Sequence, residues 1–123
     1  MKSILITAIL LTQLNLKPNC VVEDMMEQLL MMKYIRPHRE SDTEYYLFKN
    51  EYSENCSHVK FGKKTLVLSS KEEGNVFKIL KLDSLGTRAH IEVLLENENM
   101  VLKGKYDKIK GKWKLENSTF IVY

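Results

Sequence analysis

The spacing of apolar side chains changes once along this chain, and that change limits its fold more than any other feature. Between Pro18 and Pro37, apolar residues recur at intervals of three and four, the spacing of one face of an α-helix. Asn19 can serve as the N-cap, and Pro37 disfavours helical geometry at Arg36, so we expect one helix between the two prolines. The residues of its apolar face are Val22, Met25, Met26, Leu29 and Leu30.

After Thr43 the apolar residues alternate with polar ones, as they do in strands that bury one face. Gly62 and Lys63 form a turn signal between two short strands, which predicts a hairpin. Residues 76–82 interrupt their alternation and indicate a β-bulge, and Asn117 and Ser118 indicate a break before the last strand. The expected strands are 45–48, 58–61, 65–69, 76–82, 87–96, 100–106, 112–116 and 119–123.

One helix followed by hairpin-connected strands predicts an α+β fold. The helix has to bury its methionine and leucine face, and the sheet has to bury one of its own faces. Packing one on the other satisfies both requirements. We therefore expect one N-terminal helix packed on an antiparallel meander sheet, in two layers.

The first residues have the pattern of a secretory signal peptide. Lys2 gives a basic start, and residues 4–14 are an apolar stretch too short to span a bilayer. We expect residues 1–19 to be a signal peptide and residues 20–123 to form a single α+β domain, secreted or periplasmic. No small-residue processing site precedes residue 20. An uncleaved N-terminal anchor and a packed N-terminal helix therefore stay open as alternatives.

The expected compartment bears on the redox state of the cysteines. Cys20 and Cys56 are the two cysteines of the chain, and in an oxidising compartment they favour one disulfide. Closing so long a loop would stabilise the fold by about 3–4 kcal/mol. The alternatives are two unpaired thiols, or the loss or modification of Cys20 together with the leader.

The charge of the chain limits its partners. The formal net charge is +3, and removing Lys2 and Lys17 with the leader leaves +1. This balance argues against nucleic acid as a partner. No segment after residue 20 approaches the ~18–20 apolar residues of a membrane span, so we expect no stable membrane insertion after signal removal.

A resemblance is carried by the segment 108–115, which reads K-x-x-G-x-W-x-L, with Lys108, Gly111, Trp113 and Leu115 at the specified positions. A helix followed by long antiparallel strands and this hairpin resembles the cystatin-like, NTF2-like superfamily. The resemblance implies a cone between helix and sheet, capped by the tryptophan. The chain departs from it in two respects: one helix precedes the sheet where NTF2-like proteins usually have three, and the QxVxG loop of inhibitory cystatins is absent. Because that superfamily hosts unrelated functions, the resemblance bears on fold and not on activity.

The lysines near the C-terminal end are the most conspicuous candidate binding residues. Lys103 and Lys105 share one face of a strand, and Lys112 and Lys114 share a face of the next strand, opposite Trp113. Paired across a hairpin, they would form a cationic strip for an anionic glycan, a lipid head group or an acidic partner. The alternative is a solvated outer face whose lysines discourage aggregation between sheet edges.

Aromatic residues after the helix are the second set of candidates. Tyr45, Tyr46 and Tyr52 lie close together in the sequence, and such residues, like Trp113, favour interfaces and ligand grooves. The alternative for the tyrosines is packing in the core and rim around the end of the helix. In that case they would stabilise the fold and contact no partner.

Patterns of catalysis and metal binding are weak in this chain. Cys56 and His58 share a strand face, but zinc would need two more ligands, such as His90 and a carboxylate, so we expect no metal or cofactor. The motifs of serine hydrolases, zinc proteases and phosphate-binding loops are absent from the sequence.

We therefore expect a small exported, non-enzymatic binding domain for a protein partner or a small apolar ligand, of an inhibitor or immunity type. The alternative is a cone-shaped NTF2-like enzyme acting on a hydrophobic small molecule. An enclosed pocket with a buried histidine or carboxylate at its base would favour the enzyme.

Overall fold

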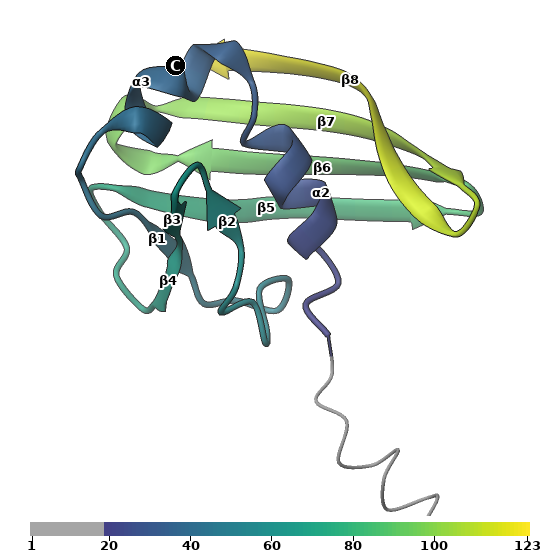
Figure 1. Cartoon of the computed structure of the whole chain (residues 1–123), viewed down its shortest axis with the longest axis horizontal. Helices are drawn as coiled ribbons and strands as arrows, with labels where there is room; N and C mark the ends of the chain where they lie inside the picture. The colour runs from purple at the N-terminus through teal and green to yellow at the C-terminus, as the bar shows by residue number, and fades with distance from the viewer. Residues whose placement is uncertain (1–18) are drawn as a thin grey trace, which may run out of the picture.

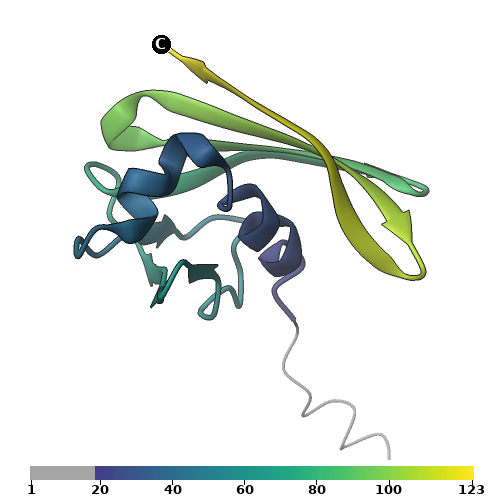
Figure 2. The same ribbon diagram turned by 45° about the horizontal axis from the view of Figure 1, so that its top comes forward.

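The structure, a computed structural model, describes residues 19–123, so the expected signal peptide lies outside the described residues except for Asn19. The fold is α+β, as the sequence predicts (Figure 1). Its helices and the two-stranded β2–β3 sheet lie on one side of a large sheet (Figure 2). In chain order the elements are α2 (Glu23–Leu29), η1 (Lys33–Ile35), α3 (Arg36–Glu40), β1 (Tyr46–Phe48), β2 (Lys60–Phe61), β3 (Lys64–Thr65), β4 (Val67–Ser69), β5 (Val76–Leu85), β6 (Arg88–Leu95), η2 (Glu96–Glu98), β7 (Met100–Ile109) and β8 (Lys112–Val122).

The main sheet has six strands in the order β4-β1-β5-β6-β7-β8. Strands β5 to β8 form the expected antiparallel meander. Strand β1 instead pairs in parallel with both β4 and β5, so the expectation of a purely antiparallel sheet is wrong at this end. The cause is the long excursion through residues 49–66, because a crossover of that length lets the chain return in the same direction.

The single helix expected between Pro18 and Pro37 is wrong, because the structure has α2, η1 and α3 in this region. Pro37 lies in the first turn of α3, where its missing N–H costs no hydrogen bond. The break is stabilised by Arg39, whose Nη1 donates to the carbonyls of Leu30 at 2.8 Å and Met32 at 3.1 Å. Between residues 19 and 123, no helix combines the length and apolar character needed to cross a bilayer.

Strand β8 is longer than expected, since it runs continuously through Asn117 and Ser118. The register shifts there: Leu115 lies opposite Tyr106 and Asn117 opposite Lys105, which leaves Glu116 as the extra residue of a bulge. The bulge expected in β5 is confirmed between Ile79 and Lys81. The hairpin expected around Gly62 is confirmed as β2–β3, while residues 67–69 leave it and join the main sheet as β4.

The core lies between α2 and the inner face of the sheet. Met25, Met26 and Leu29 of α2 are buried there. Tyr106 of β7 is 1% exposed, and its hydroxyl donates a 2.6 Å hydrogen bond to the carbonyl of Met25. Gly104 makes room for this ring, because a Cβ at that position would lie 2.9 Å from Tyr106 Cε1. Tyr106 therefore locks α2 onto β7.

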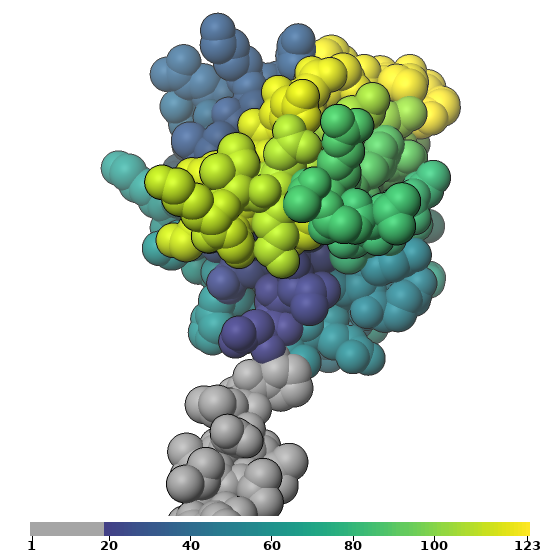
Figure 3. All heavy atoms as spheres, turned by 90° about the vertical axis from the view of Figure 1, so that its right-hand side faces the viewer, coloured from purple at the N-terminus to yellow at the C-terminus, as the bar shows by residue number. Residues whose placement is uncertain are grey.

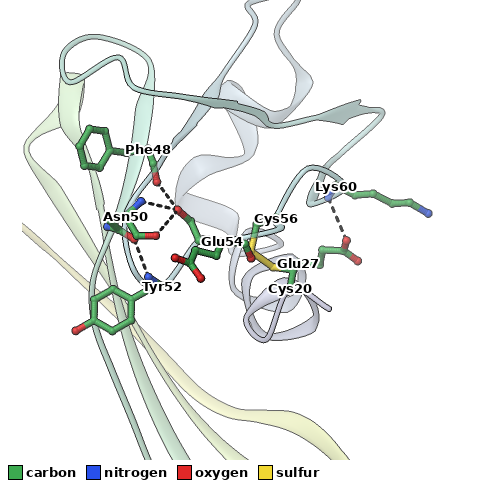
Figure 4. Close-up of a disulfide and its surroundings, with 9 residues drawn as sticks. Cys20, Glu27, Phe48, Asn50, Tyr52, Glu54, Cys56 and Lys60 are labelled. Carbon is green, nitrogen blue, oxygen red and sulfur yellow. Dashed lines mark hydrogen bonds between the residues drawn. A yellow bond between two sulfur atoms is a disulfide. The ribbon is translucent and has the colours of Figure 1, made fainter. Parts of the chain in front are cut away.

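The disulfide expected between Cys20 and Cys56 is confirmed (Figure 4). It joins the chain just before α2 to the loop that follows β1, with Cα atoms 4.7 Å apart. The same loop is held by Ser53, whose hydroxyl donates to the carbonyl of Phe48 at 2.7 Å, and by Asn50, whose Nδ2 donates to the carbonyl of Ile79 at 2.9 Å. The bridge thus links α2 to a loop that is itself attached to the sheet.

Lys64 secures the end of α3. Its Nζ donates to the carbonyls of Ser41 at 2.6 Å and Thr43 at 2.8 Å, and it lies 5.1 Å from the centre of the Tyr45 ring. We expect Lys64→Met to lower the free energy of unfolding by about 1–2 kcal/mol, because these carbonyls lose a charged donor. Urea denaturation measures the change. The exposed neighbour Lys63 is the matched control, and a similar loss in Lys63→Met would contradict the assignment.

Candidate binding surface

In the part of the chain that the structure describes, residues 19–123, the helices lie on one side of the large sheet and leave its other face uncovered (Figure 2). Strand β6 shows which residues belong to each face, because Ile91 and Val93 are fully buried while the alternating residues His90, Glu92 and Leu94 are partly exposed. We call the uncovered side the open face. The register of β5 to β8 places on it the side chains that alternate with the core residues.

The four candidate lysines gather on the open face. Lys103 lies opposite Glu92 and Thr119, and Lys105 lies opposite His90 and Asn117. On the neighbouring strand, Lys114 lies opposite Asp107, and Lys112 projects to the same side one alternation further along. Within residues 19–123, no carboxylate approaches these lysines closely enough to form an ion pair.

Three carboxylates of the open face, those of Glu92, Asp107 and Asp83, lie beside other side chains. Nε2 of His90 lies 3.0 Å from a carboxylate oxygen of Glu92. Nε of Arg88 lies 3.9 Å from Asp107, and Nζ of Lys81 lies 3.3 Å from Asp83. Lys103, Lys105 and Lys114 therefore have no carboxylate ion-pair partner of their own, and Arg88 and Lys81 offset part of the negative charge of Asp107 and Asp83.

A shallow depression of about 510 Å³ lies at the far end of this face. Figure 3 shows the ends of the β5–β6 and β7–β8 hairpins side by side there. The hydrogen bond to Asp107, together with the charge of Asp107, raises the pKa of Glu116. The lining therefore offers cationic donors beside a pair of interacting carboxyl groups. Its members include Arg88, His90, Lys105, Asp107, Glu116 and Asn117.

The candidate aromatic residues do not gather in one place. Tyr45 is 4% exposed and packs edge-on against Phe61 in the core, so it presents almost no surface to a partner. Tyr46 lies on the side of the open face and is partly exposed. Tyr52 and Trp113 are partly buried against the core. Of the four, Tyr46 is the one on the open face, but β5 and β6 separate its strand from the lysines of β7 and β8.

Sequence reasoning missed an apolar row on the open face. Leu94 of β6 lies opposite Val101 of β7, which in turn lies opposite Ile121 of β8. The signal was present in the sequence, because Leu94 occupies a position that the alternation of its strand assigns to the polar side. This row gives one end of the open face an apolar character beside the lysines.

The inner side of the sheet is occupied by packed side chains such as Met25 and Tyr106. The fully buried residues of the described chain are apolar or tyrosine apart from Ser53. No three histidine, cysteine or acidic side chains in the described part of the chain could hold one metal ion together, and Cys56 is committed to the disulfide. Compared with models of protein families, with curated proteins and with solved structures, the chain matches none.

Proposed function

We propose that this chain is an exported, non-enzymatic binding domain whose open face docks on a protein partner with an acidic surface. The observation that carries the proposal is the set of lysines on β7 and β8 that lack carboxylate partners on an uncovered sheet face. The disulfide between Cys20 and Cys56 supports a location outside the cytoplasm, secreted or periplasmic.

The composition of the open face supports a protein partner over a small apolar ligand. The depression at its far end is open to solvent and includes several charged residues, whereas sites that bury an apolar ligand are enclosed. Leu94, which is partly exposed, and Ile121, which is 41% exposed, add apolar area beside the charges. An apolar part bordered by charged groups is the arrangement common in protein–protein interfaces.

The packing of the inner side favours binding over the cone-shaped enzyme that the superfamily resemblance suggests. The space between helix and sheet is occupied by Met25, Tyr106 and their neighbours. The hydroxyl of Tyr106 is held by the carbonyl of Met25 and is not directed at a substrate site. A substrate would have to displace this contact to enter.

The proposal is tested with poly-L-glutamate as an acidic polypeptide probe. We expect the wild-type chain to bind the probe, and K103Q/K105Q/K114Q to bind it about tenfold more weakly, since each lysine contributes roughly 0.5 kcal/mol at an exposed site. Fluorescence anisotropy at low ionic strength measures the affinity. Added salt should weaken wild-type binding, because exposed charges are screened.

The matched control is K33Q/K60Q/K63Q, which removes the same charge from exposed lysines off the open face. It should change the affinity less than twofold. Equal losses in the two triple variants would mean that net charge alone governs binding, and the open face would then have no special role. A wild-type chain that does not bind the probe at low salt would also refute the acidic partner.

A further inference from the structure

We propose that the C-terminal half of β8 pairs edge to edge with β8 of a second copy of this chain, forming an antiparallel, two-fold symmetric dimer. Strand β8 is one edge of the six-stranded sheet. The inference concerns this edge and does not depend on what binds the open face.

The direction of the backbone groups shows which of them are free. In an antiparallel ladder, alternate residues direct both N–H and C=O toward the neighbouring strand. Tyr123 donates its N–H to the carbonyl of Asn99 at 2.8 Å, so the odd-numbered residues at this end face β7. Ser118, Phe120 and Val122 therefore direct their backbone N–H and C=O groups away from β7. Within residues 19–123, no hydrogen bond from another segment reaches them.

The first half of the same edge is already occupied. The side-chain amide of Gln28 donates to the carbonyl of Trp113 at 2.8 Å and accepts from the N–H of Leu115 at 2.8 Å. Gln28 thus satisfies the outward groups of β8 as a neighbouring strand would. The bulge at Glu116 ends this protected stretch, and the remaining edge begins directly after it.

The side chains of residues 117–123 are suited to pairing with themselves. The segment reads NSTFIVY and contains no charged side chain, in a chain of which 28% of the residues are charged. Exposed edges are normally protected by lysines, proline or short length. Here Lys112 and Lys114 lie in the half that Gln28 already covers. The other edge, β4, is only three residues long.

The sequence of residues 117–123 favours a second copy of this chain as the strand that pairs with the free edge of β8. With the two-fold axis at Phe120, Ser118 lies opposite Val122 and Thr119 opposite Ile121 of the other copy, so no charged residue opposes another. β-branched and aromatic residues across a strand pair stabilise it. Phe120 and Tyr34, whose ring centres are 3.9 Å apart, and the 56% exposed Val122 would meet their counterparts on one side of the sheet. Because the contact is two-fold, it closes at a dimer.

Sedimentation equilibrium of the full exported chain tests association. We expect the weight-average mass to rise from monomer to dimer between about 1 µM and 1 mM, and Val122→Lys to weaken the association at least about tenfold. Val67→Lys places the same charge at a 41% exposed position on the β4 edge and should leave association unchanged. A wild-type chain that is monomeric at 1 mM overturns the proposal, as does an equal effect of the two variants.

Cross-linking tests the register without relying on a destabilising charge. Thr119 and Ile121 lie on the open face of β8 and face each other across the proposed axis. We expect Thr119→Cys and Ile121→Cys proteins to form a disulfide-linked dimer when mixed, at least about tenfold faster than either protein alone, since directly opposed Cβ atoms lie ~4.5–5.5 Å apart and offset ones ~7–8 Å. Equal rates in the mixture and in the separate proteins would exclude this register and with it the dimer.

Discussion

Replacing Cys20 and Cys56 together with serine lowers the free energy of unfolding by about 3–4 kcal/mol. The two residues are separated by 36 positions, so the bridge removes the entropy of a long loop from the unfolded chain. This amount is a large part of the total stability of a domain of this size. Urea denaturation of the double variant measures it against the oxidised wild type.

The loss of stability should be concentrated in the loop after β1 and at the start of α2. Within the loop after β1, backbone hydrogen bonds are few and local, such as Cys56 N–H to the carbonyl of Ser53 at 3.1 Å. Without the bridge, amide hydrogen exchange should rise in residues 49–59 and at the start of α2 more than in β6 and β7. Wild-type protein reduced with dithiothreitol is the control and should match the double variant. A loss below about 1 kcal/mol would show that packing alone holds α2 in place.

The parts of the fold that the sequence predicts are those set by local patterns. Alternation of apolar and polar residues identified β6, and the turn at Gly62 identified the β2–β3 hairpin. The same alternation places Lys103 and Lys105 on one strand face, so the lysine-bearing surface was predictable as well. Each of these features depends on neighbours within a few residues.

The parts that could not be predicted depend on distant partners. Met32 continues the helical spacing of apolar residues, and the break there is stabilised by Arg39, which lies seven and nine positions after the carbonyls that it contacts and so outside the helical repeat. The parallel pairing of β1 depends on the route of residues 49–66, which carries no periodic signal. The absence of ion-pair partners for the lysines depends in part on the register that sets Arg88 opposite Asp107, whereas the contact of His90 with Glu92 is local to β6.

Tyr106 is the second residue whose alteration should have a large effect. Its hydroxyl is buried and donates to the carbonyl of Met25, 81 positions earlier in the chain. We expect Tyr106→Phe to lower the free energy of unfolding at pH 7 by about 1 kcal/mol, because the buried hydrogen bond that joins β7 to α2 is lost. Tyr123→Phe is the matched control, since that side chain is 76% exposed, and it should change stability by less than ~0.5 kcal/mol.

The stability difference between the wild type and Tyr106→Phe should decrease at high pH, because the Tyr106 hydroxyl is buried. Burial, and secondarily the charge of Asp24, raises the pKa of Tyr106 above its ordinary value of about 10. The folded protein therefore holds this proton more tightly than the unfolded chain, so stability is unaffected below pH 10 and falls above it by up to about 1.4 kcal/mol per pH unit. Phenylalanine has no proton to lose, so the wild type should lose its advantage as the pH rises from 10 to 12. Urea denaturation at pH 7, 10 and 11 gives the comparison, in which the other tyrosines and the lysines titrate equally in both proteins and cancel. The contradicting outcome is a difference in free energy of unfolding between wild type and Tyr106→Phe that stays constant from pH 7 to pH 11. In that case the hydroxyl of Tyr106 ionises without opening the contact between α2 and β7, and the buried hydrogen bond does not hold the two elements together.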